Sequence, residues 1–271
     1  MNLPPVVVAP TVTKLPPDMR GAVLVAGSHG GQYAAWFAAE SGARAVILHD
    51  AGVGRDRAGI AVLDLFGGQG VAVATVAHTT ARVGDPADMM ARGRISHANA
   101  QAQALGVLPG MPCAEAAERL RQAPLRTAHL PKVTEARVVL RPEGALRDLV
   151  LVDSASLVDP VADRGAVVVA GSHGGLIGGR ADQALRADAC AACFHDAGIG
   201  IDDAGIGRLP VLDARGIAAI AVAADSARIG QARSVFEDGI VSAVNATAAA
   251  WGARPGECAR DRLLAWTRRP G

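Results

Sequence analysis

The sequence GAVLVAGSHGG at residues 21–31 returns almost unchanged as GAVVVAGSHGG at residues 165–175. A second block, AVILHDAGVGRDRAGI at residues 45–60, returns as AACFHDAGIGIDDAGI at residues 191–206. Alignment of the chain with itself from the second block onward gives 27 identities in 68 positions. A repeat unit of this length indicates a duplicated domain or half-domain, because solenoid repeats are only about 20–45 residues long.

Each repeat predicts an α/β fold. In the first repeat, the apolar runs AVLVAG, ARAVILHD and VAVATVAH are expected strands. They alternate with the expected helices QYAAWFAAESG and RAGIAVLDLFGGQG, and a third helix is expected near SHANAQAQALG. Such alternation is typical of parallel sheets covered on both faces. We therefore predict an internally duplicated α/β chain with one or two mostly parallel sheets, helices on both faces, a pseudo-twofold, and flavodoxin- or caspase-like three-layer halves.

The repeats are expected to occupy residues 1–145 and 146–271. VVVAP near the start of the chain and LVLVD at residues 149–153 should each add one strand to a repeat. The segment ARVVLRPEGALRDLVLVD, which begins near residue 135 and has Pro-Glu-Gly at its centre, predicts a hairpin that joins the halves. It has no counterpart in the first repeat, so the second repeat should hold one extra strand.

The composition limits the classes of function. The 271 residues carry a formal net charge of +1 and 20% charged side chains, which argues against a nucleic-acid-binding surface. No apolar run approaches the roughly 20 residues of a membrane span, and the opening MNLPPVVVAP lacks the basic start of an export signal. We therefore expect a cytoplasmic protein with no membrane partner. Four cysteines imply no disulfide framework, and Cys190 and Cys193 are expected to be small apolar fillers.

Polar residues that both repeats keep lie where the predicted strands end, and ligands of open parallel sheets bind beyond the carboxyl ends of the strands. We therefore predict two crevices, one in each repeat. The expected catalytic residues are His29, His49, Asp50, His173, His195 and Asp196. The expected substrate-binding residues are Ser28, Gly30, Gly31, Arg82, Ser96, Asn99, Ser172, Gly174, Gly175, Arg228, Ser242 and Asn245.

The Gly-Ser-His-Gly-Gly turns suggest anion binding, because a glycine-rich turn that opens a helix presents backbone N–H groups to an anion or a developing oxyanion. The alternative is that Ser28 caps the helix and His29 is a solvated passenger. A histidine beside an aspartate at a strand end can act as an oriented acid/base pair. The alternative there is that Asp50 caps the next loop and His49 packs in the core.

The arginines after the third strands have two interpretations. Arg82 and Arg228 can hold a substrate carboxylate or phosphate in a bidentate grip. Alternatively, they form salt bridges to Asp50 or Asp196 and fix the loops. Ser96 and Asn99 are expected to share one face of a helix, as are Ser242 and Asn245, and either capping or helix packing would explain them.

No cofactor is predicted, because the glycine spacing matches neither the dinucleotide fingerprint G-x-G-x-x-G nor a phosphate loop. The repeats differ at His78 and His97, where the second repeat has Ala224 and Ala243. A divalent-metal site built from four histidines of the first repeat is therefore an alternative: His29, His49, His78 and His97. The spacing matches no strong ligand motif such as H-E-x-x-H.

The order of strand, Ser-His-Gly, helix, strand and acidic turn is similar to caspase-like peptidases, in which a His-Gly dyad precedes a cysteine at the next strand end. The likeness covers about two strands and implies a related sheet order. Ala51 and Ala197 stand near the cysteine position, so the resemblance does not imply cysteine peptidase activity. No G-x-S-x-G elbow indicates a serine hydrolase either.

Together these features predict an enzyme for a small polar, carboxylate-bearing metabolite. Hydrolysis of a C–N (amide-type) bond is the first choice, with His29 or His173 as acid/base. The alternatives are a non-redox lyase, hydratase or tautomerase, a small-anion-binding protein without catalysis, or a subunit of a larger enzyme. A homo-oligomer or a partner subunit is expected, because the alanine-rich helix faces would tolerate an interface.

Overall fold

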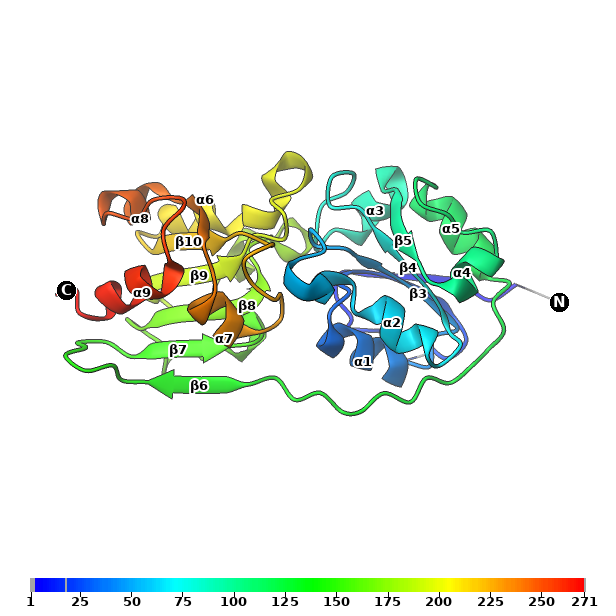
Figure 1. Ribbon diagram of the computed structural model, residues 1–271, viewed down its shortest axis with the longest axis horizontal. Coiled ribbons are helices and arrows are strands. Elements are labelled where there is room, and N and C mark those ends of the chain that lie inside the picture. Colours follow the sequence, from blue (N-terminus) through cyan, green and yellow to red (C-terminus); the bar gives the residue numbers. More distant parts are fainter. Residues whose placement is uncertain (1–2, 18, 271) are drawn as a thin grey trace.

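The computed structural model describes residues 3–17 and 19–270, which form two mixed, mostly parallel sheets with helices around them (Figure 1). The first sheet has the order β1-β2-β3-β4-β5, and the second has the order β11-β10-β9-β8-β7-β6. The strands of the first sheet are β1 (Val6–Ala9), β2 (Val23–His29), β3 (Ala45–His49), β4 (Ala72–Val76) and β5 (Ile95–Ala98). Those of the second are β6 (Arg137–Leu140), β7 (Leu149–Val152), β8 (Val167–His173), β9 (Ala191–His195), β10 (Ala218–Val222) and β11 (Val241–Val244).

The helices follow the same division into a first half (β1 to α5) and a second half (β6 to α9). The first half holds α1 (Gln32–Glu40), α2 (Val62–Gly67), α3 (Pro86–Arg92), α4 (Ala100–Ala104) and α5 (Cys113–Leu120). The second half holds α6 (Arg208–Asp213), α7 (Ala232–Glu237), α8 (Ala246–Ala250) and α9 (Ala259–Thr267). None of the helices in the described part of the chain is long and apolar enough to cross a membrane.

Apolar residues on both faces of each sheet explain why helices cover both sides. In β2, Leu24 and Ala26 pack in the cluster that contains α1 and α2, whereas Val23 and Val25 pack in the cluster that contains α3, α4 and α5. The second sheet is buried in the same way, between α6 on one face and α7, α8 and α9 on the other. This period-two alternation confirms the predicted α/β class and the covered, mostly parallel sheets.

The strand order corrects one finer expectation. Strands β1 to β4 and strands β7 to β10 are parallel and lie in chain order, whereas a flavodoxin-like sheet has the order 2-1-3-4-5. The predicted hairpin is present, because β6 pairs with β7 in antiparallel register and gives the second sheet its extra strand. Helix α5 ends at Leu120 and β6 begins at Arg137, so the connection between the halves lies between these residues, and the boundary at residue 145 stays a prediction.

One predicted helix is shorter than expected, and the second half lacks a counterpart of α1. The segment expected to be helical near SHANAQAQALG begins as β5, which pairs antiparallel with β4, and only its second part forms α4. In the second half, the turn after β8 leads into two short 3-10 segments, Ile177–Gly179 and Ala181–Gln183, where the first half has α1. Gly178 and Gly179 both have positive φ angles (58° and 69°), which end any regular helix there.

The two halves meet through the carboxyl ends of their parallel strands (Figure 1). The loop after β3 donates from the Arg55 N–H to the Ala224 carbonyl oxygen at 2.8 Å. The corresponding loop after β9 donates from the Ile201 N–H to the His78 carbonyl oxygen, also at 2.8 Å. These bonds join equivalent positions of the two repeats, an arrangement consistent with internal duplication and a pseudo-twofold.

Gly52 and Gly198 lie at the centre of this contact. A Cβ atom on Gly52 would lie 2.8 Å from the Cα atom of Gly198, and Gly52 has a φ angle of +75°. In the described residues, every non-glycine residue with positive φ belongs to the two loops that carry these glycines: Ala51, Val53, Asp56, Arg57, Ala197, Ile199, Asp202 and Asp203. The contact therefore depends on strained loop backbone as well as on missing side chains.

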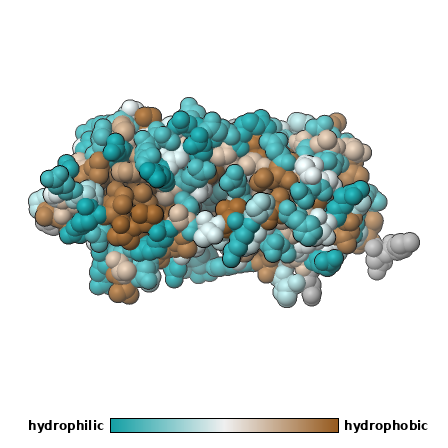
Figure 2. All heavy atoms as spheres, turned by 60° about the horizontal axis from the view of Figure 1, so that its bottom comes forward, coloured by the Kyte–Doolittle hydropathy of each residue, from teal (hydrophilic) through white to brown (hydrophobic). Residues whose placement is uncertain are grey.

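The face shown in Figure 2 is largely hydrophilic, with compact apolar groups, one of them toward the left end of the view. Strand β6 is an edge strand, and its Val138, Val139 and Leu140 are exposed. The segment from Arg121 to Ala136 runs along the outside of the molecule from the end of the first half to β6 (Figure 1). Residues 133–135 of this connection line the cavity described below.

Gly52→Ala should destabilise the protein more than Gly216→Ala does. Both glycines have positive φ angles, +75° and +68°, but the added Cβ of Gly216→Ala meets nothing within 4 Å. The control therefore reports the backbone strain alone, about 1–2 kcal/mol, and Gly52→Ala should lose about 1–3 kcal/mol more in unfolding free energy through the clash. Denaturant unfolding of both variants measures the difference, and equal losses would show that the glycine contact does not constrain the interface.

Candidate functional site

Residues of both halves line one cavity of about 1160 Å³ between the sheets. His29 and His173 both line it, one from the end of β2 and the other from the end of β8. The sequence predicted a separate crevice in each repeat. The structure instead brings the two Ser-His-Gly-Gly turns to a common space, because the strand ends of the halves face each other.

Both cavity histidines are held in one tautomer by the backbone. The Nδ1 atom of His29 accepts the N–H of Gly31 at 3.1 Å, and that of His173 accepts the N–H of Gly175 at 3.1 Å. A neutral ring that accepts at Nδ1 carries its hydrogen on Nε2. Neither Nε2 atom has a hydrogen-bond partner among the described residues, so each ring can donate to a ligand.

The surroundings keep both rings neutral. Burial, with smaller effects from the charges of His195 and His49, lowers the pKa of His29 to about 4. Burial and the nearby charge of Arg208 lower the pKa of His173 well below its usual value. These histidines are therefore neutral hydrogen-bond donors at pH 7, and their Nδ1 atoms are already occupied as acceptors.

The glycine N–H groups of the turns are not available to an anion. The Gly30 N–H donates to the His49 carbonyl oxygen at 3.0 Å, and the Gly174 N–H donates to that of His195 at 2.8 Å. The N–H groups of Gly31 and Gly175 are the ones that hold the histidine rings. The expected backbone anion cradle is thus absent from these positions, and the imidazole rings are the groups through which these two turns can donate to a ligand.

Ser28 and Ser172 line the cavity but hold neighbouring loops rather than cap helices. The Ser28 hydroxyl oxygen accepts the Val12 N–H at 3.1 Å, and the Ser172 hydroxyl oxygen accepts the Ala155 N–H at 2.7 Å. The N-cap residue of α1 is Gly31, which provides no side-chain cap. The serines therefore connect the strand-end turns to the loops that follow β1 and β7.

His49 and His195 are buried, and both nitrogens of each ring have backbone partners. In His49, Nε2 lies 2.9 Å from the Ala81 carbonyl oxygen and Nδ1 accepts the Ala51 N–H at 3.1 Å. His195 makes the equivalent contacts with the backbone of Ala227 and Ala197. This geometry leaves no ring nitrogen for a substrate, so these histidines position the loops at the interface.

Asp50 and Asp196 brace the same loops. One carboxylate oxygen of Asp50 accepts the N–H of Gly52 at 3.1 Å and the N–H and Nδ1 of His78 at 2.9 and 3.0 Å. Burial alone would raise the pKa of Asp50, but the hydrogen bond from His78 and the charges of His49 and His78 lower it overall. Asp196 accepts the Gly198 N–H at 2.8 Å and has Ala224 where the first half has His78.

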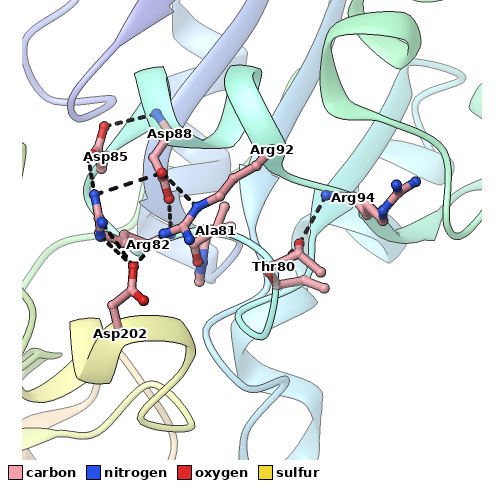
Figure 3. A network of polar contacts seen from close by, with 10 residues as sticks. Thr80, Ala81, Arg82, Asp85, Asp88, Arg92, Arg94 and Asp202 are labelled. Atoms are coloured by element: carbon pink, nitrogen blue, oxygen red, sulfur yellow. Dashed lines mark hydrogen bonds and ion pairs between the residues drawn. The ribbon is translucent and has the colours of Figure 1, made fainter.

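Arg82 and Arg228 bind aspartates of the opposite half. Arg82 Nη2 lies 2.8 Å from Asp202 Oδ2, within a network that also contains Asp85, Asp88 and Arg92 (Figure 3). Arg228 Nη2 lies 2.5 Å from Asp56 Oδ2. The salt-bridge alternative is therefore present, but to Asp202 and Asp56 rather than to the predicted partners Asp196 and Asp50.

Ser96 and Asn99 do not share a helix face, because Ser96 lies in β5 and Asn99 is the N-cap of α4. The Asn99 amide accepts the Val73 N–H at 3.0 Å and donates to the Val71 carbonyl oxygen at 2.8 Å. Ser242 and Asn245 hold β11 and α8 in the same way. None of these four side chains lines the large cavity; Ser96 and Asn99 line a smaller one of about 520 Å³.

The structure does not assemble the four first-repeat histidines into a metal-binding group. His49 is occupied by the backbone, His78 binds Asp50, and His97 lines the smaller cavity. Among residues 3–17 and 19–270, no group of three or more His, Cys, Asp or Glu side chains is arranged to hold a metal ion.

The sequence analysis missed several cavity residues that the other repeat does not share, among them Arg208, Tyr33 and Glu135. Arg208 is buried and lines the cavity beside His173. Tyr33 and Glu135 line it from α1 and from the connection that precedes β6. Burial raises the pKa of Glu135, and burial and the Glu135 charge raise the pKa of Tyr33 to about 12. No repeat-based comparison could have found these residues.

We found no protein-family model that matches the chain, and neither the curated proteins nor the solved structures gave a match. The function therefore has to be inferred from the cavity itself.

The His78–Asp50 pair should make stability depend on pH. Hydrogen bonding to Asp50 raises the pKa of His78 above 6.5. The contribution of the charged His78 to the free energy of unfolding is therefore complete below pH 6.5, and it is lost as the pH rises through the raised pKa. His78→Ala copies the residue of the second half, and it should cost on the order of 1 kcal/mol more unfolding free energy at pH 5.5 than at pH 9. Denaturant unfolding at both pH values measures this difference.

The neighbouring Thr79→Ala variant is the control for that experiment. Thr79 is exposed and makes no ion pair in the described structure, so its replacement should cost the same at both pH values. A cost of His78→Ala that does not change between pH 5.5 and pH 9 would contradict a charged pair.

Proposed function

We propose that the protein is an enzyme for a small polar, carboxylate-bearing metabolite that binds in the cavity between the halves. The observation that supports this proposal best is the pair of neutral imidazoles, His29 and His173, whose Nε2–H groups have no hydrogen-bond partner in residues 3–17 and 19–270. A neutral imidazole fixed as a donor polarises a carbonyl group and stabilises an oxyanion. It does not act as a general base, because its only basic nitrogen is occupied.

Hydrolysis of a C–N (amide-type) bond is the reaction we favour. In this proposal, Glu135 accepts a proton from water, and the hydroxide adds to the amide carbon. The resulting oxyanion accepts hydrogen bonds from His29 and His173. When the C–N bond breaks, the proton moves to the departing amine, and a carboxylic acid and an amine or ammonia are released. The raised pKa of Glu135 supports its role, because it lies closer to neutral pH than an ordinary carboxyl group.

The same donors suit a second reaction class. A non-redox lyase, hydratase or tautomerase also develops negative charge on a carbonyl oxygen, and a raised carboxyl pKa would serve for abstraction of an α-proton. A binding protein without catalysis would use the donors alone. The proposal also includes an internal duplication in which the repeated histidines of both halves serve one site, while a homo-oligomer or a partner subunit stays a prediction.

A nuclear magnetic resonance (NMR) screen in D2O with small linear and cyclic amides that carry a carboxylate tests the proposal. It detects hydrolysis as new acid and amine signals, and enolisation as loss of an α-proton signal. We expect hydrolysis of at least one amide. Exchange of the α-proton for deuterium without hydrolysis would favour the tautomerase class. Binding of an amide without hydrolysis or α-proton exchange would contradict the enzyme proposal.

His29→Asn and His29→Gln should separate catalysis from folding. Asparagine retains an acceptor near the Nδ1 position for the Gly31 N–H and removes the Nε2 donor, whereas glutamine places an N–H group near Nε2. We expect His29→Asn to lower kcat about 100- to 1000-fold, as loss of an oxyanion donor does, and His29→Gln to lower it less. Steady-state kinetics on the hydrolysed amide measures both variants.

His97→Asn is the matched control, because His97 lines the smaller cavity and not the one between the halves. It should leave kcat unchanged. Full activity of the double variant His29→Asn, His173→Asn would remove both rings from the reaction and overturn the mechanism.

A further inference from the structure

Arg208 is a buried cation whose protein contacts are all neutral. It is the first residue of α6, and only 3% of its surface is exposed. Its Nε donates to the Gly175 carbonyl oxygen at 3.0 Å, and its Nη1 donates to the carbonyl oxygens of Gln183 and Ala184. The guanidinium carbon lies 5.3 Å from the centre of the Phe194 ring.

No carboxylate within the described chain forms an ion pair with Arg208. Arg137, by contrast, forms an ion pair: its Nη2 atom lies 2.7 Å from Oδ1 of the buried Asp163 carboxylate. Burial of an uncompensated charge costs several kcal/mol, so such groups are normally paired. Burial lowers the pKa of Arg208 to about 10, which leaves the side chain protonated at neutral pH.

The Arg208 side chain lies at the wall of the cavity, where a ligand could supply the negative charge that the protein does not. Arg208 lines it next to His173, and no hydrogen bond within the described residues uses the Nη2 atom. The equivalent position in the first half is Val62, so this cation occurs on one side of the pseudo-twofold only. A ligand with one anionic end would therefore bind in a single orientation.

We propose that Arg208 binds the carboxylate of the substrate and that the substrate is a monoanion whose charge replaces the missing counter-ion. This proposal rests on the proposed function in that it assigns the anionic end of the same ligand. It moves the anion-binding role away from Arg82 and Arg228, which are already paired with aspartates. At Arg208 itself a carboxylate fits better than a phosphate, because this one guanidinium balances one negative charge, although Lys14, Arg180, Arg186 and Arg228 also line the cavity.

A comparison of propionate with propionamide tests the charge requirement without any turnover. The two molecules have nearly the same shape and differ in charge. At constant ionic strength, propionate at about ten times its Kd should raise Tm by roughly 3–6 °C, and propionamide should raise it much less. Inorganic phosphate is the third probe.

Arg208→Met should abolish the response to propionate. Arg215→Met is the matched control, because Arg215 also donates to backbone carbonyl oxygens of the same segment, those of Leu185 and Ala187, but does not line the cavity. The control should keep the full rise in Tm. If Arg208→Met does not fold, Arg208→Lys retains the charge on a shorter, non-forked side chain and should show a weaker rise than the wild type.

Four outcomes would overturn the proposal: equal responses to propionate and propionamide, no response to propionate at 100 mM, an undiminished response in Arg208→Met or Arg208→Lys, or an Arg208-dependent response to phosphate alone. These outcomes are independent of the hydrolysis experiment. A carboxylate can bind Arg208 in a protein that hydrolyses no amide, and loss of activity in His29→Asn leaves the response to propionate in place.

Discussion

The backbone contact between Gly52 and Gly198 is the constraint on which the interface depends. Only glycine permits this approach, and the flanking loops accept left-handed conformations at Val53 and Ile199, which β-branched residues rarely adopt. The loops keep this shape because His49, His195, Asp50 and Asp196 hold their N–H groups. The same shape directs Asp56 and Asp202 toward arginines of the opposite half. Once the loops meet, the ends of β2 and β8 border a single cavity.

Most residues that the repeats share hold the interface loops and the strand ends in place. Residues that the repeats do not share supply charged groups to the cavity. His49, Asn99 and their equivalents satisfy backbone groups in both halves. Arg208 has Val62 as its equivalent and Glu135 has none, so both make the cavity asymmetric in charge. In the described part of the chain, the histidines of the Ser-His-Gly-Gly turns are repeated, line the cavity and have an Nε2 atom without a hydrogen-bond partner. The repeated contacts of the two halves thus border a cavity whose lining is not the same on both sides.

The sequence predicted the α/β class, the strands β1 to β4 and the β6–β7 hairpin, because long apolar runs and turn residues identify them locally. It missed β5 and β11, since an antiparallel edge strand of four residues has no distinctive periodicity next to an alanine-rich helix. Repetition located His29 and His173 but could not separate them from His49 and His195, which differ only in where their ring nitrogens point. The comparison of the repeats could not identify Arg208, because the first half has Val62 at that position and the lack of an ion pair is seen only in the structure.

The protonation state and tautomer of His29 and His173 test the central claim most directly. Two-dimensional NMR of the ¹⁵N-labelled imidazoles reports both properties for the free protein. Our account predicts that both rings keep the hydrogen on Nε2 and stay neutral from pH 8 down to about pH 5, since burial lowers their pKa values. A titration of either ring near pH 6.5, or a hydrogen on Nδ1, would contradict the assignment of these histidines as neutral donors to the substrate.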